Sequence, residues 1–214
     1  GRSTIGVDVV SGNGFVSGQP VGVVDGIDTG FTGAARLVDA AKISRHLDAG
    51  EIVLLSALAY SPWGDTFNVR TEEIAARAAP ALLASKLIFV NAGHEFAWKD
   101  INIPPESTSR RVASLRLDDA RKLLERREEL SRAGSCGVAA QLLDLTHWCV
   151  SALEQGVTRA HLIAPTDGAL LRELYTRDGA GTLISRDIYE GIRSATSSDI
   201  DSLVSLIAPL EIDG

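Results

Sequence analysis

Residues 167–182 read DGALLRELYTRDGAGT, and they follow a short apolar run, RAHLIAP, at residues 159–165. The apolar run has the length of a strand, and the Asp-Gly pair after it indicates a turn. Apolar residues then recur at helical spacing: Ala169, Leu170, Leu171 and Leu174. The glycines of the DGAG segment break the helix before another apolar run begins at Leu183. The pattern predicts strand, short helix, glycine loop and strand, an α/β arrangement.

The glycine loop is a candidate ligand site. Gly179 and Gly181 let backbone N–H groups approach a small anionic group, because neither residue carries a Cβ atom. Glu173 lies upstream on the helix, where its carboxylate can meet a cationic group of the same ligand. The alternative is a helix C-cap followed by a tight turn. The G-x-G spacing alone does not decide between the two.

Two stretches carry a family resemblance. HLI at 161–163 with DGALLRELYTRDGAGT resembles the end of the amino-acid kinase domain of N-acetylglutamate synthases and N-acetylglutamate kinases. SRDIYEGIRSATSSDID at 185–201 resembles the start of a synthase's acetyltransferase domain, which the kinases lack. The DIYEGIR wording is closest to plant-type synthases. The resemblance covers most of the chain, with a looser match at 91–135.

The resemblance implies an α/β fold in two parts. Residues 1–189 would be the C-terminal portion of a three-layer amino-acid kinase-like domain with a largely parallel sheet. Residues 190–214 would be the first strand and helix of an acetyltransferase (GNAT-like) domain.

Composition and charge limit the classes of partner. The 214 residues are 45% hydrophobic and 23% charged, as in ordinary globular domains. The net charge of −7 argues against nucleic acid or an anionic membrane surface as a partner. No apolar run approaches the ~20 residues needed to span a bilayer. Cys136 and Cys149 do not form a C-x-x-C motif, and we expect two reduced thiols.

Three patterns define the elements expected before residue 60. Apolar residues alternate between glycine turns at 7–38, which predicts hairpins. Asp39 is suited to cap a helix that runs to about Leu47. Residues 51–59, EIVLLSALA, form a continuous apolar run, typical of a parallel strand buried on both faces.

A polar loop at 60–70 leads into a helix that begins near Thr71 and is predicted to run to about Lys86, interrupted at Pro80. In the kinases that this region resembles, the helix start reads Asn-x-Asn-Ala-Asp. There the Asn side chains hold the acylated amino acid, and the Asp organises phosphoryl transfer.

This chain matches the kinase motif only at Asn68, with Arg70 in place of the second Asn and Glu72 in place of the Asp. Phosphoryl transfer depends on positioning, so a long cation and a longer acid should disable it. Lys86 stands where the kinases meet nucleotide, and we interpret it as a solvated cation at a helix end. The pocket of Asn68, Arg70, Glu72 and Lys86 is therefore predicted to be vestigial.

The region from 91 to 156 offers fewer candidates. Residues 91–111 predict a surface loop, in which His94 and Glu95 are too isolated for a metal site. A strongly charged helix is expected at 118–132, capped by its two Asp residues, and a well-patterned helix at 139–155. In arginine-regulated relatives, a lysine in the middle of the second helix contacts the effector's carboxylate. Ser151 falls at that position and lacks the charge.

The resemblance implies that the parent protein makes N-acetyl-L-glutamate from acetyl-CoA and L-glutamate, the first step of arginine biosynthesis. Neither the acetyl-CoA loop nor the glycine-rich opening of the kinase domain is present, so we expect a central part of a longer protein, inactive alone. We name no catalytic residue, no metal ligand and no cofactor of this segment; acetyl-CoA is the parent's co-substrate.

The predicted effector is L-arginine, bound by Glu173, Gly179, Gly181 and Ser151. A homo-oligomer is expected, in the plastid stroma by resemblance and otherwise in the cytoplasm, with no nucleic-acid or membrane partner. Two alternatives stay open. One is an N-acetylglutamate kinase, and the other is a non-catalytic module for arginine sensing or oligomerisation.

Overall fold

The computed structural model of the chain describes residues 6–12, 14–91, 111–126, 138–176 and 179–186. The predicted acetyltransferase start at 190–214 lies outside these residues, as do most of the predicted loop at 91–111, Cys136 and residues 127–132. The described elements, in chain order, are β1 (Val9–Ser11), β2 (Val16–Pro20), β3 (Val23–Val24), β4 (Ile27–Asp28), β5 (Gly33–Val38), α1 (Ala40–Asp48), β6 (Ile52–Leu54), β7 (Leu58–Tyr60), β8 (Thr66–Asn68), α2 (Thr71–Ala81), β9 (Lys86–Val90), β10 (Ser114–Arg116), α4 (Leu117–Glu125), α6 (Val138–Glu154), β11 (Arg159–Ile163), α7 (Ala169–Tyr175) and β12 (Thr182–Ser185).

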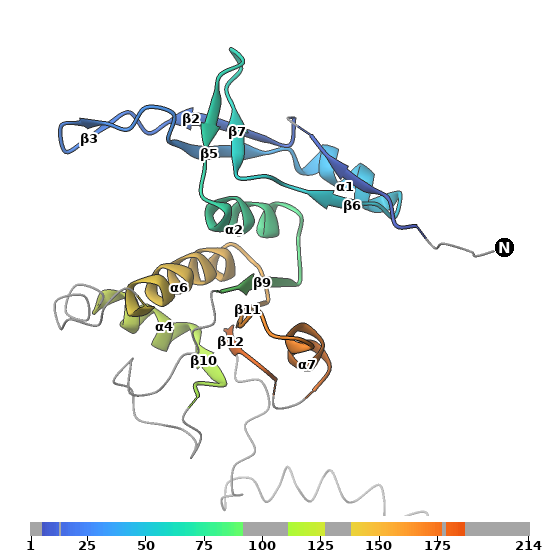
Figure 1. Cartoon of the computed structure of the whole chain (residues 1–214). Helices are drawn as coiled ribbons and strands as arrows, with labels where there is room; N and C mark the ends of the chain where they lie inside the picture. Colours follow the sequence, from blue (N-terminus) through green and yellow to red (C-terminus); the bar gives the residue numbers. More distant parts are fainter. Residues whose placement is uncertain (1–5, 13, 92–110, 127–137, 177–178, 187–214) are drawn as a thin grey trace, which may run out of the picture.

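The C-terminal sheet has the strand order β10-β12-β11-β9. Its β10–β12 and β11–β9 pairs are parallel, and its β11–β12 pair is antiparallel, so the sheet is mixed. Helices α4 and α6 lie on one side of β11 and β12, and α7 lies on the other side (Figure 1). This confirms an α/β fold and the predicted order of strand, short helix, glycine loop and strand at 159–185.

The N-terminal strands form a second four-stranded sheet, β5-β2-β7-β8, and the β3–β4 hairpin projects from it (Figure 1). An isolated bridge between Thr32 and Asn68 brings the two ends of this sheet together. Glycine permits the close approach: a Cβ on Gly33 would overlap the side chain of Phe67. The hairpins predicted for this region are confirmed.

The continuous strand predicted at 51–59 is wrong. The run divides into β6, which pairs only with β1 among the described residues, and β7, which belongs to the four-stranded sheet. Alternate residues of β6 also face solvent, since Ile52 and Leu54 are 52% and 58% exposed. The strand is covered on one face only, where Val53 packs against the core.

Two hydrophobic cores fill the structure. The C-terminal core lies between the mixed sheet and its helices and consists of Ala76, Ala79, Leu87, Phe89, Val112, Leu115, Leu117, Ala120, Leu123, Leu142, Leu143, Leu145, Cys149, Val150, Ala152, Leu153, Val157, Ala160, Leu162 and Ile184. The N-terminal core consists of Phe15, Val16, Ala35, Val38, Ile43, Ala59, Phe67, Val69, Ile74 and Ala78.

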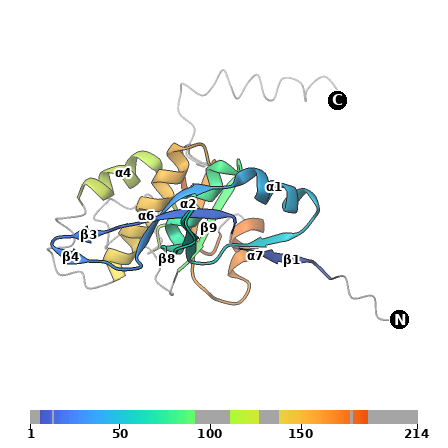
Figure 2. The ribbon, with the colours of Figure 1, turned by 90° about the horizontal axis from the view of Figure 1, so that it is seen from above.

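Helix α2 belongs to both cores. Ile74 and Ala78 face the N-terminal core, while Ala76 and Ala79 face the C-terminal core. In Figure 1, α2 lies between the N-terminal strands and α6, and in Figure 2, seen from above, these layers overlap. The alanine side chains on both faces of α2 are small, so the helix can pack closely against both neighbours.

Helix α2 ends earlier than predicted, at Ala81 rather than near Lys86. The N–H of Ala84 bonds to the carbonyl of Ala79 at 2.8 Å, and the N–H of Leu83 bonds to that of Pro80 at 3.0 Å. This is the Schellman ending, with Leu83 in the left-handed conformation (φ 53°) that glycine usually takes. Lys86 is therefore the first residue of strand β9, not a helix-end cation.

Of the remaining helix predictions, those for α1 and α6 are confirmed, whereas α4 ends at Glu125 rather than at residue 132. The carboxylate of Asp39 accepts the N–H of Lys42 at 2.9 Å and so caps α1. The two Asp residues of α4 lie in its first turn, but Arg116 is its N-cap residue, so the predicted Asp caps are wrong. Helix α6 ends before Gly156 (φ 112°), as expected. Among the described residues, no helix is long and apolar enough to cross a membrane.

Candidate functional site

The predicted site lies where β11, α7 and the start of β12 meet. Strand β11 runs between β9 and β12, so nearly all of its residues are buried. Gly168 then turns the chain in the left-handed conformation (φ 73°), and the seven residues of α7 follow. These two features return the helix across β11, and they place Glu173 against the middle of the strand.

The carboxylate of Glu173 is the centre of this site. Its Oε2 accepts the backbone N–H groups of Ala180 and Gly181, each at 2.7 Å. Its Oε1 lies 2.7 Å from Nδ1 of His161 on β11. The side chain is only 4% exposed. Glu173 therefore joins the helix, the glycine loop and the strand through three short contacts.

His161 is a site residue that the sequence analysis missed. Its side chain is 7% exposed, and its Nε2 is buried without a hydrogen-bond partner among the described residues. A histidine between the buried apolar residues Ala160 and Leu162 is the signal that was available. A buried polar nitrogen without a partner is uncommon enough to indicate either stored free energy or an absent partner group.

Opposing effects set the pKa of Glu173. Burial acts to raise the pKa of the carboxyl group, because it disfavours the charged form. The hydrogen bonds from His161, Ala180 and Gly181 favour the carboxylate, and together they hold its pKa below the ordinary value near 4.5. The site therefore carries a buried negative charge at neutral pH.

The loop glycines are required by close packing around this carboxylate. A Cβ on Gly179, which has a φ of 59°, would lie 2.6 Å from Oε2 of Glu173. A Cβ on Gly181 would overlap the backbone carbonyl of Leu162 on β11. Thus the loop can approach Glu173 and β11 only because both positions lack a side chain.

The arrangement leaves a defined capacity for ligand binding. A carboxylate offers about four acceptor positions, of which His161 and the two loop N–H groups occupy three. A cationic donor such as a guanidinium can take the remaining position or replace one of these donors. The loop N–H groups of Ala180 and Gly181 become available to an anionic group only when Glu173 releases them.

The structure brings Glu173, Gly179 and Gly181 together, but it places Ser151 elsewhere. Ser151 lies on α6, where its Oγ is 3.2 Å from Nε2 of Gln155. In Figure 1, α6 and α7 lie apart, with β11 and β12 between them. The contribution of Ser151 to a shared pocket stays a prediction.

The four residues of the predicted vestigial pocket are spread over β8, α2 and β9. Arg70 is the N-cap residue of α2, and its guanidinium pairs with Asp144 on α6 and lies 3.9 Å from Glu72. The hydrogen bond to Asp144 raises the pKa of Arg70 above its ordinary value. Asn68 and Lys86 are exposed. Arg70 thus ties α2 to α6.

Two other candidate chemistries find no support in the described part of the chain. No group of three or more His, Cys, Asp or Glu side chains is placed to hold a metal ion among these residues. Cys149 is a free, fully buried thiol, and burial raises its pKa, which makes it a poor nucleophile.

The described α/β fold is one that carbamate kinases share. A solved carbamate kinase from Giardia shares the fold at a TM-score of 0.53 and 11% identity, over 85% of this chain and 63% of its own. The N-acetylglutamate synthase of Neisseria gonorrhoeae, solved with coenzyme A and L-arginine, is more similar. It has a TM-score of 0.69 and 34% identity over 95% of this chain.

Homologues of the chain are amino-acid acetyltransferases. Those of Pseudomonas fluorescens (strain SBW25) and Azotobacter vinelandii are 42% and 41% identical over 96% of this chain. No model of a known protein family matches the chain. The chain spans 44% of the length of these two relatives, and 43% of the Neisseria synthase.

Proposed function

We propose that the chain is the kinase-like part of an amino-acid N-acetyltransferase that makes N-acetyl-L-glutamate from acetyl-CoA and L-glutamate. The observation that carries this proposal is the identity of about two residues in five to amino-acid acetyltransferases along almost the whole chain. In the proposed division, residues 1–189 form the kinase-like domain and residues 190–214 begin the acetyltransferase domain. The catalytic residues and the acetyl-CoA site then belong to other parts of the parent protein.

Acetyl transfer to glutamate fixes what the parent protein must supply. The amine of glutamate attacks the thioester carbonyl of acetyl-CoA, the carbon–sulfur bond breaks, and coenzyme A leaves as the thiol. Positioning of the two substrates and hydrogen bonds to the carbonyl oxygen lower the barrier of such a reaction. Within the parent, the present segment would have a structural and regulatory role.

We propose that this role is the binding of L-arginine at Glu173. The Neisseria synthase, with which this chain shares 34% identity, has been solved with L-arginine. The buried carboxylate of Glu173 has one acceptor position left, which suits a guanidinium. The backbone at Gly179 and Gly181 lies within reach of the same carboxylate and would take the amino-acid end of the ligand.

A kinase is the weaker alternative. Phosphoryl transfer needs a substrate pocket with precise positioning. At the helix start where the kinases hold their substrate, the Arg70 guanidinium pairs with Asp144 and approaches Glu72. This engagement supports the vestigial interpretation. A non-catalytic arginine-sensing module is favoured by a specific observation, the preformed Glu173 loop, and it describes what this segment would do by itself.

The plant-type parent, its plastid location and its assembly as a homo-oligomer are further proposals. The first two rest on the resemblance of residues 187–193, DIYEGIR, to plant-type synthases. Immunolocalisation of the parent protein and its mass by light scattering would test them.

The acetyltransferase proposal is tested by assaying coenzyme A release from acetyl-CoA. The parent protein should release the thiol only when L-glutamate is present, and the 214-residue chain should not release it. Neither protein should produce ADP from ATP and N-acetyl-L-glutamate. ADP production by the wild-type chain would contradict the vestigial pocket, and a parent that is inert with glutamate would contradict the proposed reaction.

The arginine proposal is tested by calorimetric titration of the parent protein with L-arginine. Losing one partner of a buried charge pair costs about 2–5 kcal/mol, so Glu173→Ala should abolish measurable binding. Glu173→Gln should weaken it severely, because the amide keeps the shape without the charge. Ser151→Lys should strengthen binding if a lysine there contacts the effector. Equal affinity in wild type and Glu173→Ala would place the site elsewhere.

A further inference from the structure

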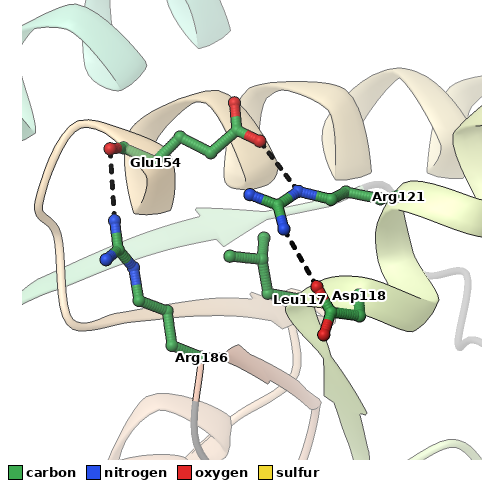
Figure 3. Close-up of a pocket in the computed structure, with 5 residues that line it drawn as sticks. All are labelled: Leu117, Asp118, Arg121, Glu154 and Arg186. Carbon is green, nitrogen blue, oxygen red and sulfur yellow. Dashed lines mark hydrogen bonds and ion pairs between the residues drawn. The ribbon is translucent and has the colours of Figure 1, made fainter.

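A polar pocket lies at the point where the described chain leaves the C-terminal sheet. Its volume is about 490 Å³, and it is lined by Leu117, Asp118 and Arg121 of α4, Glu154 at the end of α6, and Arg186, which follows β12. Figure 3 shows the two arginines approaching Glu154 from opposite sides of the pocket. One contacts its backbone and the other contacts its carboxylate.

Arg186 binds the C-terminus of α6. Its Nη2 donates to the carbonyl oxygens of Leu153 at 2.6 Å and Glu154 at 3.1 Å, and its Nε donates to that of Leu153 at 3.2 Å. The last carbonyls of a helix lack partners within the helix and carry partial negative charge. A guanidinium satisfies two of them at once. These hydrogen bonds therefore hold residue 186 against the end of α6.

Arg121 makes a second connection in the same pocket. It donates to Glu154 and to Asp118, each at 2.9 Å, and the hydrogen bond to Glu154 raises its pKa. These contacts join α4 to α6 by exposed side chains, a kind of ion pair that contributes little to stability. Arg121 thus lines the same pocket, and among the described residues its side chain bonds to Glu154 and Asp118 rather than to Arg186.

Covalent connection links Arg186 to the Glu173 loop. Gly181 donates its N–H to Glu173 and accepts a hydrogen bond from Arg111 through its carbonyl oxygen at 2.5 Å. The four residues of β12 follow directly, paired with β10 on one side and β11 on the other. Arg186 is the next residue. The loop contact at Gly181 and the guanidinium contacts of Arg186 therefore lie at the two ends of one four-residue strand.

We propose that Arg186 is a positioning residue that couples ligand binding at Glu173 to the end of α6 and to the part of the parent protein that follows. The inference rests on the proposed function. In the proposed binding mode, the amino-acid end of the ligand takes the loop N–H groups that Glu173 now accepts, and this release shifts the loop at Gly181. Strand β12 transmits the shift, and the guanidinium contacts at Leu153 and Glu154 pass it to the end of α6.

The experiment uses the parent protein in wild-type form and with Arg186→Ala, Arg186→Lys and Arg121→Ala. Two quantities are measured for each: the Kd for L-arginine by calorimetry, and the ratio of acetyl-transfer rates with and without saturating L-arginine. The test works whether L-arginine raises or lowers the acetyl-transfer rate of the wild-type protein. Allosteric coupling usually amounts to a factor of about 5–150, so its loss is measurable.

Arg186→Ala should bind L-arginine with a Kd within about threefold of wild type, since the substitution leaves the Glu173 contacts intact, while the rate ratio should fall to near one. Arg186→Lys should give an intermediate ratio, because a lysine keeps the charge but not the fork that reaches two carbonyls. Arg121→Ala, the matched control, should keep the wild-type ratio.

Each opposing result overturns a different statement. A full wild-type ratio in Arg186→Ala would overturn the coupling role of Arg186. Equal loss in Arg186→Ala and Arg121→Ala would mean that the pocket acts only as structural support. If Arg186→Ala fails to fold, Arg186→Lys decides, and a wild-type ratio in it refutes the need for two-carbonyl contact. Wild-type protein that does not bind L-arginine would overturn the proposed effector function, and this inference with it.

Discussion

Glu173→Ala and Glu173→Gln should destabilise the protein by clearly different amounts, because the two side chains leave different groups without partners. Alanine removes the acceptor of two loop N–H groups and the partner of His161 Nδ1, all within 2.7 Å of the carboxylate. Each buried polar group left without a partner costs about 1–3 kcal/mol, and alanine leaves three such groups. We therefore expect a loss of about 4 kcal/mol for alanine.

Glutamine should be tolerated much better. Its amide oxygen can accept both loop N–H groups, and its amide nitrogen can donate to Nδ1 of His161 when the imidazole proton lies on Nε2. Shape and the three contacts are kept, while the charge is lost and the imidazole proton moves to Nε2, which has no partner among the described residues. Charge-assisted hydrogen bonds are roughly twice as strong as neutral ones, so we expect a loss of about 1–2 kcal/mol.

The pH dependence provides an independent test of the same carboxylate. The folded-state pKa of Glu173 is lowered from its ordinary value near 4.5, so its charge stabilises the folded protein above that pH. This contribution is lost as the pH falls through the lowered pKa. Glutamine does not titrate. The stability advantage of wild type over Glu173→Gln should be constant near neutrality and should shrink as the pH falls below about 4.5.

Urea unfolding followed by far-UV circular dichroism, at pH 7 and at successively lower pH, measures the stability loss of Glu173→Ala, that of Glu173→Gln, and the pH dependence of the difference between wild type and Glu173→Gln. Glu125→Ala, at an exposed glutamate of α4, is the matched control and should change stability by less than about 0.5 kcal/mol. A cost below about 1 kcal/mol for Glu173→Ala would refute the three-contact description of the site. A wild-type advantage that does not change with pH would refute the role of the charge.

Three further predictions concern backbone geometry. Gly181→Ala should cost about 1–3 kcal/mol from overlap with the carbonyl of Leu162, with further loss of the Glu173 contact. Gly168→Ala adds a Cβ in open space at a φ of 73°, so it should cost only the left-handed penalty of about 1–2 kcal/mol and leave L-arginine affinity unchanged. Leu83→Gly should raise stability by about 1 kcal/mol in urea unfolding, because Leu83 takes the left-handed position of a Schellman ending and is 91% exposed. A decrease in stability would mean that the leucine side chain makes a contact of value.

Local sequence signals predicted the elements well wherever a capping or turn residue marks the boundary. Asp39 begins α1, Gly156 follows α6, and the DGAG segment separates α7 from β12, as the sequence indicated. The strand order is a different matter. Which strands become neighbours depends on contacts far apart along the chain, so the division of 51–59 between two sheets had no local signal.

The end of α2 shows how local propensity misleads. An alanine-rich segment predicts continued helix, and the sequence carries no glycine near Leu83 to stop it. The helix instead ends with a left-handed leucine, which no propensity scale favours. Lys86, which the sequence placed at a helix end, is consequently the first residue of strand β9.

The candidate site was predictable only in part. Glu173 and the two glycines are close in sequence and could be grouped from the pattern alone. His161 reads as one more buried position of an apolar strand, and only the return of α7 across β11 brings it to Glu173. The Arg70–Asp144 pair joins residues 74 positions apart, beyond the reach of any motif.

The placement of α2 in both cores has a consequence for how the molecule opens. Glu73, which is 8% exposed, accepts the N–H of Ala35 on β5, while the neighbouring face of the helix is embedded against the C-terminal sheet and its helices. The elements around each core form a lobe: the N-terminal strands with α1, and the C-terminal sheet with α4 and α6. Neither lobe can separate without exposing one face of α2, so fluctuations that release one lobe also weaken the other. Amide hydrogens in the middle of α2 should therefore exchange with solvent only through global opening, and they should be among the slowest in the chain. The two lobes, although each has its own core, should melt as one cooperative unit.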